Sequence, residues 1–118
     1  MLTGSISAAL SIMIGAFAAH RLKDILSPEA ISLIETAHRY QIIHSIALFL
    51  TGFAAMRADL RHFQAAGVAF LMGIIFFSGS LYGLGITGLP WLGAITPVGG
   101  IGLIGGWVCL GYGLASIP

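Results

Sequence analysis

Four stretches of this chain are long, apolar and free of charged side chains. They cover residues 2–19, 42–56, 63–84 and 97–117. A helix rises about 1.5 Å per residue, so about 20 apolar residues cross the roughly 30 Å hydrocarbon layer of a membrane. Each stretch is therefore predicted to be a transmembrane helix, the second after extension at its amino end. The fold class that we expect is an all-α membrane protein, a compact antiparallel bundle of four transmembrane helices in one domain, 1–118.

The composition agrees with a membrane location. Hydrophobic residues make up 58% of the chain and charged residues only 8%, whereas soluble proteins have roughly 25% charged residues. The net charge is +1, so no basic surface for nucleic acid is expected. The expected partners are membrane lipids, further copies of the chain in a homo-oligomer, or a larger membrane complex.

The second span is expected to begin well before its apolar part. Ser27 is a suitable N-cap, Pro28 fits the first helical turn, and Glu29 places a carboxylate near the positive end of the helix. No helix-breaking residue follows before Met56, so the predicted helix from 28 has about 29 residues and is about 43 Å long. Because this exceeds the hydrocarbon thickness, its first three turns should lie in the interface unless the whole helix tilts.

The fourth span is predicted to start at Pro97 with Thr96 as its N-cap, after a Gly- and Pro-rich link over residues 83–97. Proline is tolerated at the first helical position because its missing N–H has no intrahelical partner there. The first span ends near Ala16-Phe17-Ala18, a small-x-small pattern that is also typical of signal-peptide cleavage. Its amino end has no Lys or Arg, so we expect a retained span.

Small residues at four-residue spacing predict close packing between the spans, because helices in lipid associate through close approach of their backbones. Such stripes occur on three spans: Ser7, Ser11, Gly15 and Ala19; Gly79 and Gly83; Gly102 and Gly106. Some stripes should join helices of one chain and others further copies. Ser78 and Ser80 are expected to hydrogen-bond across helices or to their own carbonyls.

Ionisable groups at membrane depth are costly, so each invites a functional interpretation. The polar residues concerned lie at the end of the first span and in the second helix: His20, Glu35, Arg39, Tyr40, Gln41 and His44. At about 100° per residue, Glu35 and Arg39 share one helix face, and His44 lies about 180° from Glu35. We interpret the group as an intramembrane or interfacial network that fixes the packing of the first two spans. The alternative is a ligand-binding pocket lined by these residues.

A metal site and enzymatic activity find no support in these residues. His38 and His44 differ by about 240° in helical phase, and the sequence has no HExxH pattern. It also lacks a nucleophile elbow, a phosphate-binding loop and a dinucleotide-binding pattern. A proton relay through Glu35 and a histidine would lack ionisable partners in the other spans. We therefore predict no catalytic residue, no metal site and no cofactor.

Four blocks of sequence carry a family resemblance: GAFAAHRLK, ETAHRYQIIHSIAL, FSGSLY and LGAITPVGGIGLIGGW. In this order they resemble the family known as domain of unknown function 423, and the resemblance spans nearly the whole chain. The positions that match the family's pattern are Gly15, His20, Glu35, Arg39, Tyr40, Gln41, His44, Ser78, Gly79, Ser80, Tyr82, Thr96, Pro97, Gly99 and Gly100. Ala18 replaces the usual glycine, and His38 stands where an apolar residue is common, so the resemblance gives His38 no shared role.

The resemblance implies a small multi-pass protein of the bacterial inner membrane, related to an animal mitochondrial transmembrane protein. It assigns no activity, and two functions remain open. One is a scaffold or accessory subunit without catalytic activity that packs against lipids or partner membrane proteins. The other is a transporter or a ligand- or ion-binding protein with a cavity lined by His20, Glu35, Arg39 and His44. The Lys and Arg residues of the two charged loops, three against two, do not fix the orientation.

Overall fold

The computed structural model describes residues 1–58 and 61–118, and every regular element within them is helical. In chain order the elements are α1 (Leu2–His20), the 3₁₀ turn η1 (Leu22–Asp24), α2 (Pro28–Arg57), α3 (Arg61–Gly73), the π-helical turn η2 (Ile74–Ser78), α4 (Gly79–Thr87) and α5 (Leu92–Ala115). The predicted all-α fold class is confirmed. Since α3, η2 and α4 follow one another without a break, they form one rod of 27 residues.

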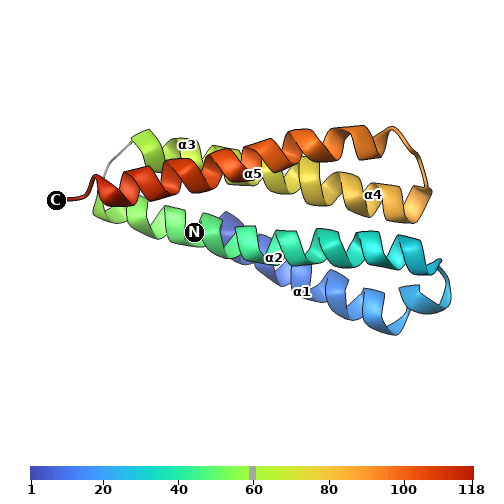
Figure 1. Cartoon of the computed structure of the whole chain (residues 1–118). Helices are drawn as coiled ribbons and strands as arrows, with labels where there is room; N and C mark the ends of the chain where they lie inside the picture. The colour runs from blue at the N-terminus through green and yellow to red at the C-terminus, as the bar shows by residue number, and fades with distance from the viewer. Residues whose placement is uncertain (59–60) are drawn as a thin grey trace.

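The rods run back and forth along one long axis, and α1 lies at the side of the assembly (Figure 1). Within the described residues, α1 packs only against α2 and η1, whereas α2 also packs against α3, η2 and α4. The molecule is elongated, with extents of 52 × 26 × 16 Å. α1 is attached through α2 alone, so the compact four-helix bundle that we expected is not confirmed.

Three helical segments are long and apolar enough to cross a membrane: Leu2–Asp24, Arg61–Thr87 and Leu92–Ala115. α2 is not among them, although it has 30 residues. Its first half carries Glu29, Glu35 and Arg39, and its apolar half begins only at Ile42. Length and composition thus support three of the four predicted spans.

The start of α2 confirms the prediction from its sequence. Ser27 is the N-cap, and its hydroxyl oxygen accepts a hydrogen bond from the Ala30 backbone N–H at 3.2 Å. Pro28 occupies the first turn, where it costs no hydrogen bond. The helix ends at Arg57, one residue beyond the predicted end.

The predicted start of the fourth span at Pro97 is wrong. α4 ends at Thr87, its C-cap Gly88 has a left-handed φ of 70°, and α5 already begins at Leu92. Its first turn is formed by 3₁₀-type bonds, from Leu92 N to Leu89 O at 3.2 Å and onward. Pro97 therefore lies inside α5 and removes a single helical bond. A start at Pro97 would have left backbone groups of residues 92–96 without the helical partners that they have in α5.

The close approaches predicted from small residues occur on the first and last spans. A Cβ added at Gly15 of α1 would be 2.7 Å from His38 Cε1 of α2, and a Cβ added at Gly106 of α5 would be 2.5 Å from Phe70 Cδ1 of α3. At the carboxyl end of α1, Ala18 is buried and Ala19 is exposed, so the predicted stripe is displaced by one residue. On the third rod, nothing lies within 4 Å of a Cβ added at Gly79, whereas a Cβ added at Gly83 would be 2.9 Å from Leu92 Cδ1 of α5.

Candidate functional site

One group of buried and half-buried polar side chains lies between α1, α2 and α4. Ser7 and Ser11 are four residues apart on α1 and face α2, where His38, Gln41 and Ser45 share one face at spacings of three and four. Tyr82 of α4 completes the group. We call these six residues the polar belt: Ser7, Ser11, His38, Gln41, Ser45 and Tyr82.

Gln41 is the centre of the polar belt because its side chain joins three helices. Its Oε1 accepts a hydrogen bond from Tyr82 Oη of α4 at 2.6 Å. Its Nε2 donates to Ser7 O of α1 at 3.0 Å and lies 3.3 Å from Ser7 Oγ. Ser45 Oγ lies 2.7 Å from Ser7 Oγ and 2.6 Å from Gln41 O. The amide is 7% exposed, so both of its polar atoms are satisfied inside the protein.

His38 and Ser11 form a second, reciprocal link between α1 and α2. Ser11 Oγ donates to His38 O at 2.9 Å, and His38 Nδ1 lies 2.9 Å from Ser11 O and 3.0 Å from Ser11 Oγ. A proton on Nδ1 lets the ring donate to Ser11 O while the hydroxyl donates to His38 O. Gly15 makes room for the ring, since a Cβ there would be 2.7 Å from His38 Cε1. The residue to which the family resemblance gave no role thus holds α1 in place.

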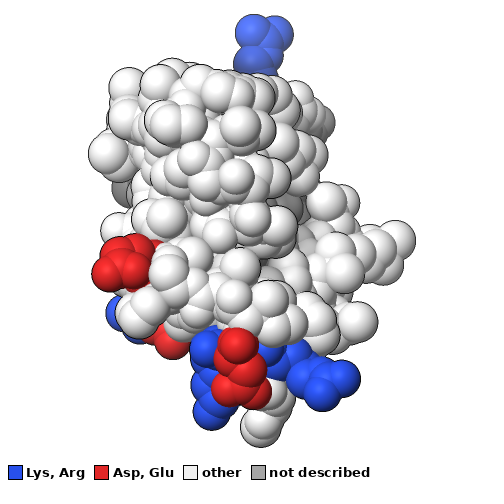
Figure 2. Space-filling model, turned by 90° about the vertical axis from the view of Figure 1, so that its right-hand side faces the viewer, with Lys and Arg blue, Asp and Glu red and all other residues white. Residues whose placement is uncertain are grey.

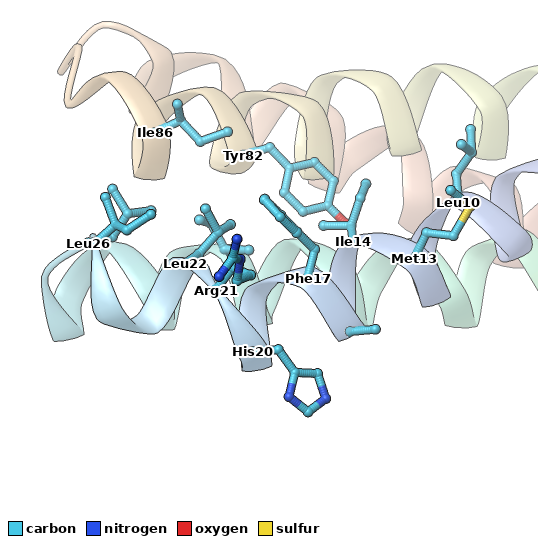
Figure 3. A pocket seen from close by; sticks show the side chains of 13 residues that line it. Leu10, Met13, Ile14, Phe17, His20, Arg21, Leu22, Leu26, Tyr82 and Ile86 are labelled. Carbon is cyan, nitrogen blue, oxygen red and sulfur yellow. The ribbon is translucent and has the colours of Figure 1, made fainter.

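The predicted group of six polar residues is not one cluster. His20, Glu35, Arg39 and Tyr40 are exposed, and only Gln41 and His44 are buried. Glu35 and Arg39 are one turn apart on α2, yet the described part of the chain contains no ion pair between them. His20 points away from the helices that surround the neighbouring groove (Figure 3). The structure therefore does not bring His20, Glu35 and Arg39 together with His44.

His44 lies on another face of α2, against aromatic side chains. Its Nδ1 bonds to Tyr40 O at 2.7 Å, and its ring stacks on Tyr40 with centroids 5.8 Å apart. The ring centroids of Phe70 of α3 and Trp107 of α5 lie 5.9 and 6.1 Å from the centroid of the His44 ring. His44 thus serves as a packing residue between α2, α3 and α5.

Two serines of the third rod form links to neighbouring helices, as expected for serine in a membrane span. Ser78 Oγ donates to Ala37 O of α2 at 2.8 Å. Ser80 Oγ lies 2.6 Å from Thr96 Oγ1 of α5 and 3.0 Å from Phe77 O. Thr96 therefore bonds across helices and does not cap the start of α5.

A groove separates α1 from α4 and has a volume of about 1060 Å³. We call it the α1–α4 groove, and its lining is almost entirely apolar (Figure 3). The lining residues are Leu10, Met13, Ile14, Ala16, Phe17, His20, Arg21, Leu22, Ile25, Leu26, Ile34, Tyr82 and Ile86. Arg21 is the one charged side chain among them, and it extends toward the groove between Leu22 and Phe17 (Figure 3).

The charged side chains lie mainly at the ends of the rods. Figure 2 looks onto the end that carries the α1–α2 and α4–α5 connections, and most of the visible charges gather on the side of the α1–α2 connection. The charged residues of this connection and the first turn of α2 are Arg21, Lys23, Asp24 and Glu29. Within residues 1–58 and 61–118, no three His, Cys, Asp or Glu side chains come together as a metal site would require.

Sequence reasoning found the small stripe on α1 but missed the polar belt and the groove. Ser7 and Ser11 were classed by size, although their spacing of four matches that of Gln41 and Ser45 on α2. That shared spacing is the signal that could have paired the two faces. The groove has no signal in the sequence, since it depends on α1 being held at the side of α2.

Comparisons with known proteins agree with the membrane character of the chain. Residues 14–100 match the sequence profile of the family described as "Protein of unknown function (DUF423)". The "UPF0382 membrane protein" of Staphylococcus epidermidis is 40% identical over 110 residues, which cover 93% of this chain and 89% of that protein. The "UPF0382 membrane protein" of Haemophilus influenzae is 38% identical over 109 residues, which cover 92% of this chain and 87% of that protein. The "UPF0382 inner membrane protein YgdD" of Escherichia coli is 31% identical over 110 residues, which cover 93% of this chain and 84% of that protein. No solved structure matches the chain.

Proposed function

Because this chain belongs to the DUF423 family, and its relatives are named membrane proteins, we propose that it is a multi-pass inner-membrane protein whose four rods all cross the bilayer. The position of α2 supports the fourth crossing. It packs against α1, α3 and α4, which belong to two of the three segments that are long and apolar enough to span. A helix packed between spans shares their depth, so its apolar half from Ile42 to Met56 lies in the hydrocarbon layer.

The protein acts as a scaffold or accessory subunit, without catalysis, that packs against lipids and partner membrane helices. The observation that carries this proposal is how the buried polar side chains are used. The polar belt, Ser78 and Ser80 all bond to other helices of this chain or to the backbone of their own helix. The exposed side chains along the rods are mainly apolar. Examples are Ile12, Ile101 and Val108, which are 61%, 72% and 66% exposed. Surfaces of this kind recognise acyl chains and other helices by packing.

The alternative function, transport or binding of a polar ligand, lacks a common cavity. His20, Glu35 and Arg39 are exposed, and His44 is enclosed by aromatic rings. The α1–α4 groove is apolar, and of these four residues only His20 is among its lining residues. A polar solute would exchange its hydration for apolar contacts there, which is unfavourable.

Photocrosslinking in intact cells tests the accessory role. A photoreactive residue at Ile12 on α1 or at Val108 on α5 should give a discrete heavier product: twice 12.3 kDa for a homo-oligomer, or another single mass for a partner subunit. Leu89, which is exposed in the α4–α5 connection, is the control position. Lipid adducts alone at both Ile12 and Val108, or products identical to those from Leu89, would contradict the proposal.

A further inference from the structure

We propose that the α1–α4 groove binds one anionic phospholipid, with the acyl chains in the groove and the phosphate at Arg21. The inference rests on the membrane placement proposed above, and it is independent of any protein partner. It starts from the fact that α1 and α4 do not pack against each other, although both line the groove. A bilayer leaves no such apolar space empty, because unfilled volume forfeits the van der Waals contacts of its lining.

The depth of the groove matches one leaflet of a bilayer. Arg21 lies at the end of α1, and Leu10 lines the groove 11 residues earlier, which is about 16 Å along the helix axis. Half of a hydrocarbon layer of roughly 30 Å is about 15 Å. With Arg21 at the level of the headgroups, the groove therefore reaches the middle of the membrane, as the acyl chains of a single lipid do.

The lining of the groove suits flexible acyl chains. The groove has a volume of about 1060 Å³, and its apolar walls continue past Arg21 to Leu22, Ile25 and Leu26. Flexible chains adapt to the irregular walls formed by Leu10, Phe17 and Ile86.

Charge complementarity selects the headgroup. Arg21 is the only charged side chain that lines the groove, and among the described residues it has no carboxylate partner within 4.0 Å. A guanidinium offers several donors in one plane and suits phosphate oxygens. A headgroup of net negative charge interacts favourably with Arg21 alone. In a zwitterionic lipid, the ammonium group of the headgroup competes with Arg21 for the phosphate.

Native mass spectrometry of the purified full chain tests the site. The protein is titrated with phosphatidylglycerol and, in parallel, with phosphatidylethanolamine of the same acyl chains. Wild type should bind one phosphatidylglycerol more tightly than phosphatidylethanolamine. Arg21→Gln should lower the phosphatidylglycerol affinity about fivefold, the effect of one cation near an anionic surface. Lys23→Gln, the same charge change outside the groove lining, should leave that affinity within about twofold.

A groove-filling variant tests the acyl-chain part separately. Ala16 lines the groove and Ala19 is exposed on α1 outside it, so Ala16→Phe should displace the lipid and Ala19→Phe should not. Helix content by circular dichroism confirms that each variant is folded. Equal binding of both lipids, equal effects of Arg21→Gln and Lys23→Gln, or full binding by folded Ala16→Phe would each overturn the inference. None of these results would affect the photocrosslinks from Ile12 and Val108, by which the accessory role is judged.

Discussion

Replacing Gln41 with leucine should loosen three helices at once. Leucine has a similar size but no polar atoms, so the change removes the bonds to Tyr82 and Ser7 without leaving a large cavity. Hydrogen bonds between membrane helices are worth about 0.6 kcal/mol on average and up to about 1.7 kcal/mol. Three contacts of average strength give about 2 kcal/mol, and the Tyr82 hydroxyl is left without its partner. We predict that the free energy of unfolding falls by about 2–3 kcal/mol.

The measurement is reversible unfolding in detergent or bicelles, followed by the helical circular dichroism signal. Gln64→Leu is the control, because Gln64 is exposed on α3 and makes none of these bonds. Tyr82→Phe should lower the free energy of unfolding by about 0.6–1 kcal/mol in the wild type. In the Gln41→Leu background, where the amide that pairs with Tyr82 is gone, it should lower the free energy of unfolding by close to nothing. A loss below about 0.5 kcal/mol for Gln41→Leu, or an equal cost of Tyr82→Phe in both backgrounds, would refute the central position of Gln41 in the polar belt.

Other substitutions test the packing in the same unfolding assay. Gly15→Ala should destabilise the protein because the added Cβ meets the His38 ring. Gly105→Ala is the control, since the space around Gly105 is open, and it should be neutral or stabilising by up to about 1 kcal/mol. Equal effects of the two substitutions would refute the close contact at Gly15. Ser78→Ala should cost about 0.6 kcal/mol through the lost bond to Ala37 O, and no change would show that this bond adds nothing to stability.

The helices could be predicted from the sequence wherever local chemistry determines them. The start of α2 follows from Ser27 and Pro28, whose preferences act within one turn. The start of α5 could not be predicted in the same way, because two prolines compete for it. Pro90 precedes the observed helix and Pro97 lies within it. The 3₁₀-type bonds of residues 92–94 start the helix ahead of Pro97, and no capping motif in the sequence marks that start.

The candidate site was less predictable because it depends on how two helices are paired. The helical phase correctly separated His44 from Glu35, yet it could not tell which face meets α1. That depends on the bonds of Ser11 to His38 and of Ser7 to Gln41, which join residues far apart in the chain. Ser7 and Ser11 are both small and polar. Their spacing of four therefore fits a packing stripe and a polar belt equally well, and the sequence does not distinguish the two.

The number of crossings is tested most directly by cysteine labelling from the two sides of the membrane. In a Cys109→Ala background, a single cysteine is either inserted directly after Met1, ahead of α1, or put in place of Ser116 after α5. An impermeant thiol reagent is added to intact spheroplasts and, separately, to inverted vesicles. If α2 crosses the membrane with the other three rods, the two cysteines react from the same side. Reaction of the two cysteines from opposite sides would mean three crossings with α2 outside the hydrocarbon layer, and would contradict the four-span architecture.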